Sequence, residues 1–336
     1  MESEKNNGLQ VGRAIAALSV AYFHSYIALR SFPAHSVHPF APLASGGFFG
    51  VNFFFAISGF VIAVVTDRFN FAIKPFLIKR FFRLYPLVAV FCLFQYALHL
   101  LNIVEVTSDH SWSRILYGMS LLPGHGERYY AVTWTLEQEV IFYLLAATIV
   151  PFFGRLTLAA ILICLAGTGN ILGFSSDETH ILTMAHADFA AGIIAYHFRD
   201  QLRCLGVVPL LLAPIAYWLA YRGAFGWGTP TGSLLALVGC ANMQLDIDRW
   251  PQRVLVEIGD ASYSIYLSHW ILLYLSNRWA HDLHLAPALA ETWRFATLAV
   301  IVVVSIMLWR RFEKPVNEFG RRVSLLRARQ PREVAG

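Results

Sequence analysis

Two ionisable side chains interrupt an apolar stretch near the start of the chain. Residues 8–30 read GLQVGRAIAALSVAYFHSYIALR, with Arg13 near the beginning and His24 past the middle. In a helix, this separation is close to three turns, so both side chains lie nearly on one face, roughly 16 Å apart along the axis. A charge at the centre of a bilayer costs roughly 2.5–3.5 kcal/mol, so such residues usually face a protein interior or a wet cavity. A packed histidine with a snorkelling arginine remains the alternative interpretation.

A pair of arginines follows the second apolar stretch. Arg80 and Arg83 occur in KRFFRLYP and are three residues apart, so they share a helix face. Paired guanidinium groups present forked donors that suit phosphate oxygens. Pro86 is predicted to mark the beginning of the next membrane span. Ordinary positive charge in a cytoplasmic loop is the alternative explanation.

The segment 125–143, HGERYYAVTWTLEQEVIFY, combines an aromatic residue with acids at the start of an apolar run. Trp134 is predicted to lie at a membrane interface. Thr135 is expected to cap the helix that follows, with Gln138 as its capping-box partner three residues on. Glu139 is either an acid that interacts with the helix dipole or a site residue.

Further ionisable residues occur late in the chain. His269 lies in the middle of the apolar stretch EIGDASYSIYLSHWILLYL, among serines that can hydrogen-bond between helices. We favour a structural role for His269. Glu313 is a lone carboxylate among the cations of RRFEKP, where a surface ion pair is the alternative to a functional acid.

Small residues and paired histidines mark two other patterns. The second apolar stretch contains Gly46, Gly47, Gly50, Ser58 and Gly59, a pattern typical of closely packed membrane helices. The following histidines have ligand-like spacing but no acidic or cysteine companions: His35, His38, His281 and His284. We therefore expect no metal site.

The elements that must position these residues are predicted from composition. The 336 residues are 57% hydrophobic and only 14% charged, against roughly 25% charged residues in soluble domains. The basic residues behind the net charge of +5 form short clusters between apolar runs, which does not indicate nucleic-acid binding. The four cysteines show no disulfide or metal spacing. From the polar start we expect no cleavable signal peptide.

This composition predicts an all-α polytopic membrane protein of a single domain, residues 1–336. About ten spans are expected, over 10–31, 46–66, 84–104, 137–153, 156–174, 181–198, 205–222, 230–246, 259–278 and 292–310. Residues 115–123 are expected to form a re-entrant or an interfacial segment. With both termini inside, about 20 of the 26 Lys and Arg residues lie on the cytoplasmic side, as the positive-inside rule requires. His24 then lies in the outer half of its helix.

Together these motifs resemble the acyltransferase-3 family of bacterial membrane O-acyltransferases. The resemblance covers about residues 8–316 and leaves 317–336 as a basic cytoplasmic tail. Its motifs are Arg13 with His24, GVNFFFAISGF, RFFR, WTLEQEVIFY, SYSIYLSH and FEKP. Asn52 departs from the family, which often has Asp there, and Thr135 replaces a usual Ser. Some members carry a C-terminal hydrolase-like domain, and we expect this protein to be the stand-alone form without it.

The resemblance implies roles for particular residues. His24 would be the catalytic histidine, with Glu313 a functional acid near the donor. Arg80 and Arg83 would hold the phosphates of acetyl-CoA, and Arg13 would line the donor path. Trp134 would help to shape the acceptor side, and Trp134 and Glu139 would be the acceptor-binding residues.

The resemblance implies an inner-membrane O-acetyltransferase that uses acetyl-CoA and a hydroxyl of a surface or exported glycan. A buried histidine suits this reaction either as a general base or as a covalent nucleophile, and the sequence does not separate the two. The alternatives are a flippase for a lipid-linked sugar, an acyltransferase for a lipid or secondary metabolite, and a scaffold. Transporters often show repeated halves, which this sequence lacks. The further partners expected are a second copy of the chain or a periplasmic assembly protein.

Overall fold

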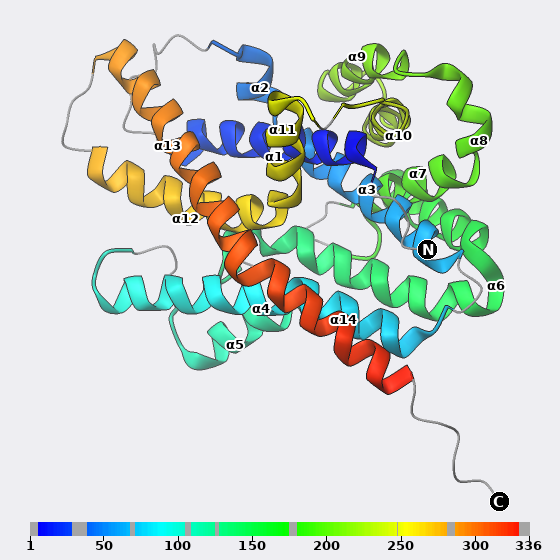
Figure 1. Ribbon diagram of the computed structural model, residues 1–336, viewed down its shortest axis with the longest axis horizontal. Coiled ribbons are helices and arrows are strands. Elements are labelled where there is room, and N and C mark those ends of the chain that lie inside the picture. The colour runs from blue at the N-terminus through cyan, green and yellow to red at the C-terminus, as the bar shows by residue number, and fades with distance from the viewer. Residues whose placement is uncertain are drawn as a thin grey trace, which may run out of the picture.

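The structure is a computed structural model that describes residues 6–28, 39–67, 71–104, 109–124, 128–174, 180–246, 248–280 and 286–328. These ranges contain helices, turns and bends, with no strand in any of them. The helices are α1 Asn7–Ala28, α2 Ala41–Gly46, α3 Phe49–Thr66, α4 Ile73–Leu100, α5 Trp112–Ser120, η1 Ala131–Thr133, α6 Trp134–Leu172, α7 Ala185–His197, α8 Arg199–Leu202, η2 Arg203–Leu205, α9 Pro209–Tyr221, α10 Gly228–Ala241, α11 Trp250–Asp260, α12 Ser262–Ala280, α13 Pro287–Leu308, η4 Trp309–Glu313 and α14 Lys314–Ala328. The expected all-helical class is confirmed (Figure 1).

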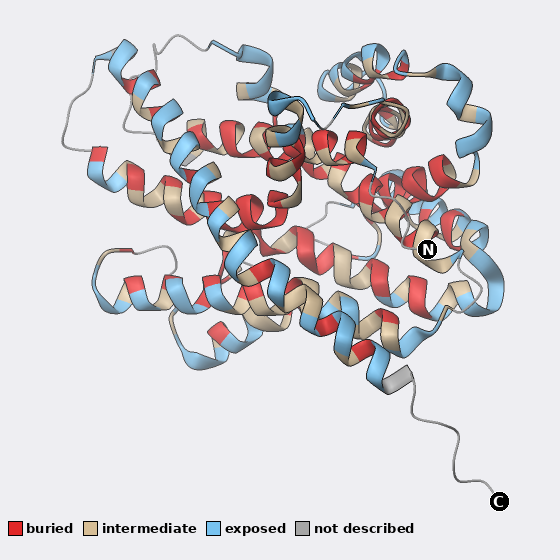
Figure 2. Ribbon diagram, viewed as in Figure 1, coloured by how far each residue is buried: buried red, intermediate tan, exposed pale blue. Residues whose placement is uncertain are grey.

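The first helix lies inside the bundle and organises it. α1 packs against α3, α10, α11 and α12, and more sparsely against α2 and α13. Much of its surface is buried (Figure 2). Because protein surrounds α1 on most sides, its polar side chains face neighbouring helices and not lipid, as expected for ionisable residues in a membrane protein.

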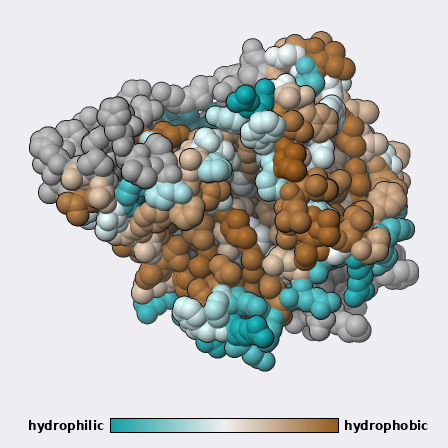
Figure 3. Space-filling view, turned by 90° about the horizontal axis from the view of Figure 1, so that it is seen from above, coloured by the Kyte–Doolittle hydropathy of each residue, from teal (hydrophilic) through white to brown (hydrophobic). Residues whose placement is uncertain are grey.

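Within the part of the chain that the structure describes, four helical segments are long and apolar enough to cross a membrane: Phe49–Thr66, Ile73–Leu100, Ala131–Leu172 and Ala288–Leu326. A bent pair, Arg199–Leu205 with Pro209–Tyr221, gives a fifth. Apolar residues cover most of the middle of the face in Figure 3, and hydrophilic residues gather mostly at its rim. These features fit a membrane protein. α1 falls outside the set, because its polar residues lower its hydropathy.

The predicted break between the spans 137–153 and 156–174 is present. α6 is interrupted at Gly154, whose φ of 82° and ψ of 169° are not helical. A positive φ costs glycine little because it has no β-carbon. Beside this break, Arg155 pairs with Asp67 just after α3, and the hydroxyl of Tyr196 donates to the same carboxylate. These contacts tie α3, α6 and α7 together at one end of the bundle.

The start of α4 differs from the prediction. Pro86 was expected to mark the beginning of a span, but α4 already begins at Ile73 and runs through the proline. Arg80 and Arg83 therefore lie on a helix, which confirms that their spacing places them on one face. Proline removes one backbone donor, and the contacts that α4 makes with its neighbours, α6, α12 and α14, hold the helix together around it.

The expected basic tail is helical over most of its length. α13 continues through a π-helical turn, Trp309–Glu313, into α14. α14 packs along α4, with the rings of Phe82 and Phe319 5.5 Å apart. Figure 1 shows α13 and α14 as one long diagonal element that crosses the bundle. Residues 314–328 are therefore part of the fold.

The chain before α6 returns into the core. Tyr129 and Tyr130 are buried, and the hydroxyl of Tyr130 donates to the backbone carbonyl of Leu267 in the middle of α12. α6 consequently begins beside the middle of α12. α5, within the stretch expected to be re-entrant or interfacial, is a short helix that packs against α4.

The small residues of α3 permit close packing, as predicted. A β-carbon on Gly50 would collide with the backbone of Ala16 in α1, and one on Gly59 with the backbone of Phe189 in α7. Close backbone approach is how small residues stabilise membrane helix pairs. These contacts fix α1 and α7 relative to α3.

Candidate active site

Two histidines from helices far apart in the sequence form the centre of the site. Nδ1 of His24 lies 2.9 Å from Nε2 of His269, and the two rings are stacked with centroids 5.0 Å apart. His269 is fully buried, whereas His24 is half-buried. The other ring nitrogen of His269, Nδ1, lies 3.1 Å from the carbonyl oxygen of Ile265.

This chain of contacts fixes the tautomers of the neutral pair. A carbonyl oxygen only accepts, so His269 must carry its proton on Nδ1, and its Nε2 is then an acceptor. His24 accordingly donates from Nδ1, which leaves the lone pair of its Nε2 available. A second group that fixes the tautomer of a histidine in this way is typical of catalytic and metal-binding histidines. The arrangement can therefore hold His24 ready to accept a proton through Nε2.

Arg13 occupies the same side of α1, as the sequence predicted. Its Nε donates to Oγ of Ser262, 3.1 Å away, at the beginning of α12. The two polar residues of α1 thus both contact α12, Arg13 at its first residue and His24 two turns further on.

A cavity lies between α1, α3, α4, α6 and α12. It offers about 60 Å³ of space to water-sized molecules, which is room for several waters. Its polar lining comes mainly from Arg13, Ser58, Arg83, Thr135, Glu139 and Tyr266. The ring of Tyr266 lies 5.7 Å from that of His269, so a single aromatic side chain connects the cavity to the histidine pair.

Two cations and two carboxylates surround this cavity. Arg13 and Arg83 each interact electrostatically with both Glu139 and Glu313. Glu139 accepts hydrogen bonds from Ser58, at 2.8 Å, and from the hydroxyl of Tyr143. The site therefore offers balanced charge deep in the protein, where charges strongly affect one another.

Glu313 is buried beside the cavity and is not part of a surface ion pair. It accepts a hydrogen bond of 2.6 Å from Oγ of Ser264 and is 4% exposed. It ends the π-helical turn η4, and such turns frequently occur at functional sites.

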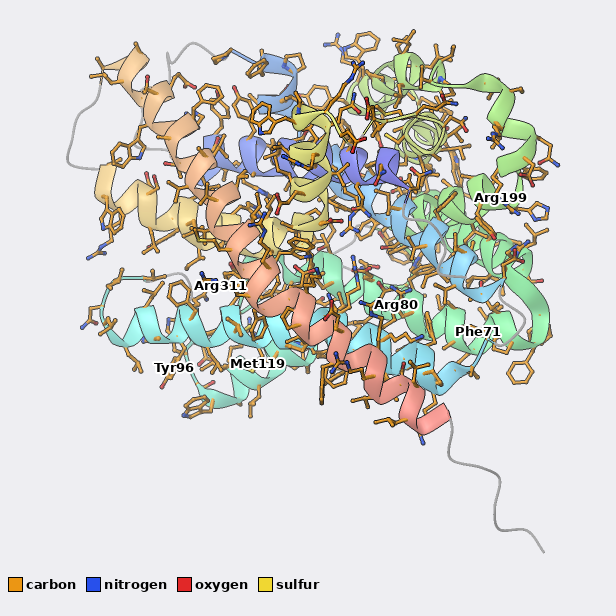
Figure 4. All side chains as sticks on the ribbon, viewed as in Figure 1. Phe71, Arg80, Tyr96, Met119, Arg199 and Arg311 are labelled. Atoms are coloured by element: carbon orange, nitrogen blue, oxygen red, sulfur yellow. The ribbon has the colours of Figure 1, made fainter. Side chains whose placement is uncertain are left out.

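The two arginines of α4 have different surroundings. Arg83 lines the cavity, whereas the Arg80 guanidinium packs over the ring of Tyr143, 5.1 Å from its centroid, and the ring of Phe76 at 5.4 Å. Arg80 lies between α4 and α6 (Figure 4). Its buried Nε has no hydrogen-bond partner among the described residues. The structure brings only Arg83 of this pair to the cavity wall.

The predicted cap of α6 is wrong. The 3₁₀ turn η1 leads directly into α6, which begins at Trp134, so Thr135 already lies inside the first turn. Its hydroxyl lies 2.7 Å from that of Tyr266 and 3.2 Å from the carbonyl oxygen of Val132. Gln138 approaches His180 at 3.4 Å in place of the helix start. Trp134 packs, partly buried, against the main hydrophobic core and is not among the residues that line the cavity.

A buried ion pair supports the end of α1 that carries His24. Arg294 pairs with Glu291 within α13, with Nε 3.2 Å from the carboxylate, and its Nη1 donates to Oγ of Ser25 at 3.1 Å. The guanidinium also lies over the ring of Tyr26, 3.6 Å from its centroid. These contacts hold the residue next to His24 against α13.

Asn52, which stands where the family often has Asp, contacts a carboxylate from another helix. Nδ2 of Asn52 donates to Asp188 at 2.7 Å, and Ser233 donates to the other oxygen at 2.8 Å. Asp188 is fully buried but does not line the cavity. This network ties α3, α7 and α10 together.

Several site residues escaped the sequence interpretation. His269 was favoured as structural, and Tyr266 received no role of its own. Ser262 was expected only to hydrogen-bond between helices, which its contact with Arg13 confirms. The three residues are spaced i, i+4 and i+7 along α12, which places them on one helix face. That periodicity in SYSIYLSH was the available signal. The ligand-like pairs His35, His38, His281 and His284 lie outside the described residues.

The geometry sets a histidine pair beside a charged cavity among membrane-type helices, and comparison with known proteins shows the class to which the chain belongs. The sequence profile of the acyltransferase-3 family, described as an acyltransferase domain, matches residues 6–310. The chain therefore belongs to this family of acyltransferases. It is also 28% identical over 296 residues to the exopolysaccharide production protein ExoZ of Rhizobium meliloti (strain 1021), which covers 81% of this chain and 90% of that protein. No solved structure matches the chain.

Proposed function

We propose that this protein is an integral membrane O-acetyltransferase that moves an acetyl group from cytoplasmic acetyl-CoA to a hydroxyl of an exported glycan. The observation that carries the proposal is the His24–His269 pair, linked through Tyr266 to a cavity lined by Arg13 and Arg83. The name of the relative ExoZ supports an exopolysaccharide as the acceptor. A lipid or a secondary metabolite is the second class of acceptor to test.

In this proposal the protein supplies a base, a charged donor site and a barrier to bulk water. His24 takes the proton of the acceptor hydroxyl through Nε2 while His269 accepts the hydrogen of its Nδ1. A positioned base of this kind contributes roughly 10²–10⁴-fold in rate. Arg83, with Arg80 behind it, attracts the phosphates of acetyl-CoA towards the cavity. Trp134 is proposed to shape the acceptor side, and Glu313 to act through the donor-side charges.

We further propose about ten spans in the inner membrane, with both termini in the cytoplasm and 1–336 as one domain. The start of α4, which carries Arg80 and Arg83, is then on the cytoplasmic side together with α14. α5 is on the outer side. The excess of Lys and Arg near these elements supports the orientation.

The experiment that tests this function is mass spectrometry of the surface glycans of the host with and without the gene. We expect the glycan to lose the mass of an acetyl group on deletion and to regain it with a plasmid copy. Unchanged glycan, with acetyl missing from a lipid or small metabolite, would transfer the proposal to that acceptor. A lipid-linked sugar moved by purified protein without consumption of acetyl-CoA would support the flippase instead.

The donor site gives a direct mutational prediction. Arg83→Ala should weaken acetyl-CoA binding roughly ten- to a hundredfold, because a hydrogen bond to a charged group contributes about 1.5–3 kcal/mol. Arg80→Ala should weaken binding too, and should also lower the melting temperature, since its guanidinium packs on Tyr143 and Phe76. Equilibrium binding of acetyl-CoA to the purified protein measures both effects.

Lys74→Ala is the matched control, because Lys74 is exposed in the first turn of the same helix. It should leave acetyl-CoA affinity nearly unchanged. Equal losses at Lys74, Arg80 and Arg83 would show that the measurement reports the general charge of this surface and no specific phosphate site.

The orientation can be tested by cysteine labelling. In a variant without the four native cysteines, all of which are free thiols, a cysteine at Lys74 or Arg322 should react only from the cytoplasmic side. A cysteine at Ser113 should react only from outside. Positions 32–38 and Arg329 would suit the same test but lie outside the described residues. Labelling of Ser113 and Lys74 from one side would overturn the proposed orientation.

A further inference from the structure

The residue after His269 places an indole group against the reactive histidine. The ring of Trp270 lies 5.6 Å from the ring of His24, centroid to centroid, and is perpendicular to it at 88°. The body of the side chain packs on the main hydrophobic core. Trp270 is therefore held in place beside His24 by α12 and its neighbours.

The nitrogen of this indole is buried without a hydrogen-bond partner among the described residues. Buried Trp N–H groups usually find a partner, and an unpaired buried donor costs about 1–3 kcal/mol. Trp293 follows the rule, since its Nε1 donates to Oγ of Ser276 at 2.8 Å. An orphaned donor that is retained next to a reactive group indicates that its partner arrives with the substrate.

Of the rings described in contact with His24, those other than Trp270 cannot donate a hydrogen bond to a bound substrate. Phe23 has no polar atom, and His269 has both nitrogens engaged, with His24 and with Ile265. His24 itself donates its Nδ1–H to His269, and its Nε2 must stay free to accept the proton of the acceptor hydroxyl. Among these side chains, Trp270 alone holds an N–H group with nothing described to receive it.

We propose that Nε1–H of Trp270 is an oxyanion donor that binds the carbonyl oxygen of the acyl group as negative charge develops on it. This inference rests on the proposed acetyl transfer and adds a catalytic residue to it. In the step, the acceptor oxygen forms a bond to the thioester carbon while its proton passes to Nε2 of His24. The carbonyl electron pair moves onto oxygen and is stabilised there by the indole N–H. When that pair returns, the carbon–sulfur bond breaks and the thiolate takes the proton from His24.

The assignment to the carbonyl oxygen and not to the acceptor hydroxyl follows from the chemistry. A hydroxyl that gives its proton to His24 attacks through its own lone pair, and a donor on that oxygen would make it a poorer nucleophile. The carbonyl oxygen gains charge only in the transition state. A donor placed for it raises kcat and leaves substrate binding nearly unchanged.

Trp270→Phe tests the inference, because phenylalanine keeps an aromatic ring and removes the N–H. We expect kcat for acetyl transfer to fall about 10²–10³-fold, the usual loss for one oxyanion donor, with KM for acetyl-CoA and for the acceptor within a fewfold of wild type. Trp293→Phe is the matched control. It removes an indole N–H that already has a partner, so kcat should stay close to wild type.

Phenylalanine is smaller than tryptophan, so a second variant tests the loss of the N–H group at nearly constant ring size. Benzothienylalanine at position 270 replaces the N–H by sulfur in a ring system of nearly the same shape, and it should show the same loss of kcat at an unchanged melting temperature. Wild-type kcat in this variant would overturn the inference, as would a loss confined to KM. Failure of the proposed function looks different, because then wild-type protein would transfer no acetyl group, or His24→Gln would keep its turnover.

Discussion

His24→Gln should reduce acetyl transfer by 10²–10⁴-fold while acetyl-CoA still binds. Glutamine keeps a hydrogen-bonding side chain of similar reach, so it preserves the packing of α1 against α12. It lacks a nitrogen that takes up a proton near neutral pH, and the expected loss is that of a general base. The assay is single-turnover acetyl transfer by membranes with matched amounts of each variant. His24→Asn should behave in the same way.

The control for this substitution is His99→Gln. His99 stacks on His110 with ring centroids 3.4 Å apart, and neither residue contributes to the cavity lining. We expect His99→Gln to keep its activity. Activity of the wild type should also decline at acidic pH, because a protonated imidazole has no lone pair for the acceptor. Near-normal turnover by His24→Gln would contradict a catalytic role for His24 and indicate that it only packs between helices.

His269→Leu is the second substitution with a large expected effect. It removes the acceptor for Nδ1–H of His24, so the proton is free to move to Nε2 and block the base. Loss of a group that fixes the tautomer of a catalytic histidine is known to cost up to about 10⁴-fold in kcat, and we expect a loss on the order of 10²-fold or more. KM for acetyl-CoA should change little, because His269 lies beyond Tyr266 from the cavity.

His269→Gln separates positioning from packing in this experiment. Its amide oxygen accepts a hydrogen bond, so it should recover a substantial part of the activity that His269→Leu loses. A purely structural His269 would give melting temperatures that fall in parallel with activity for both variants. Equal activity losses in the two variants, at equal stability, would contradict a role in holding the tautomer.

The sequence predicts the helical class well because apolar length and charge placement are local properties. The break near Gly154 and the close packing at Gly50 and Gly59 follow from single residues, and the structure confirms them. Pro86 and Thr135 were misread for a common reason. Each was assigned from a local preference for helix ends, and the tertiary contacts of α4 and the turn η1 decided the actual boundaries.

The sequence predicted part of the site, and a physical reason separates the residues that it identified from those that it missed. Arg13, Arg83, Glu139 and Glu313 stood out in the sequence as ionisable residues in or beside apolar stretches, and the family resemblance implied their site roles. The structure gathers them around one space. The partner of His24 could not be found in this way, because the His24–His269 contact joins residues 245 positions apart. Arg80 shows the converse: its spacing from Arg83 is right for a shared face, yet only the structure shows that Tyr143 and Phe76 cover its guanidinium.

The most direct measurement uses purified protein in vesicles oriented with the start of α4 outward. Labelled acetyl-CoA is added outside, and a glycan acceptor is enclosed within. We predict that label appears on the enclosed glycan, that it requires acetyl-CoA on the Arg83 side, and that His24→Gln abolishes it. Absence of label with intact, acetyl-CoA-binding protein, or equal labelling by His24→Gln, would contradict acetyl transfer through the His24–His269 centre.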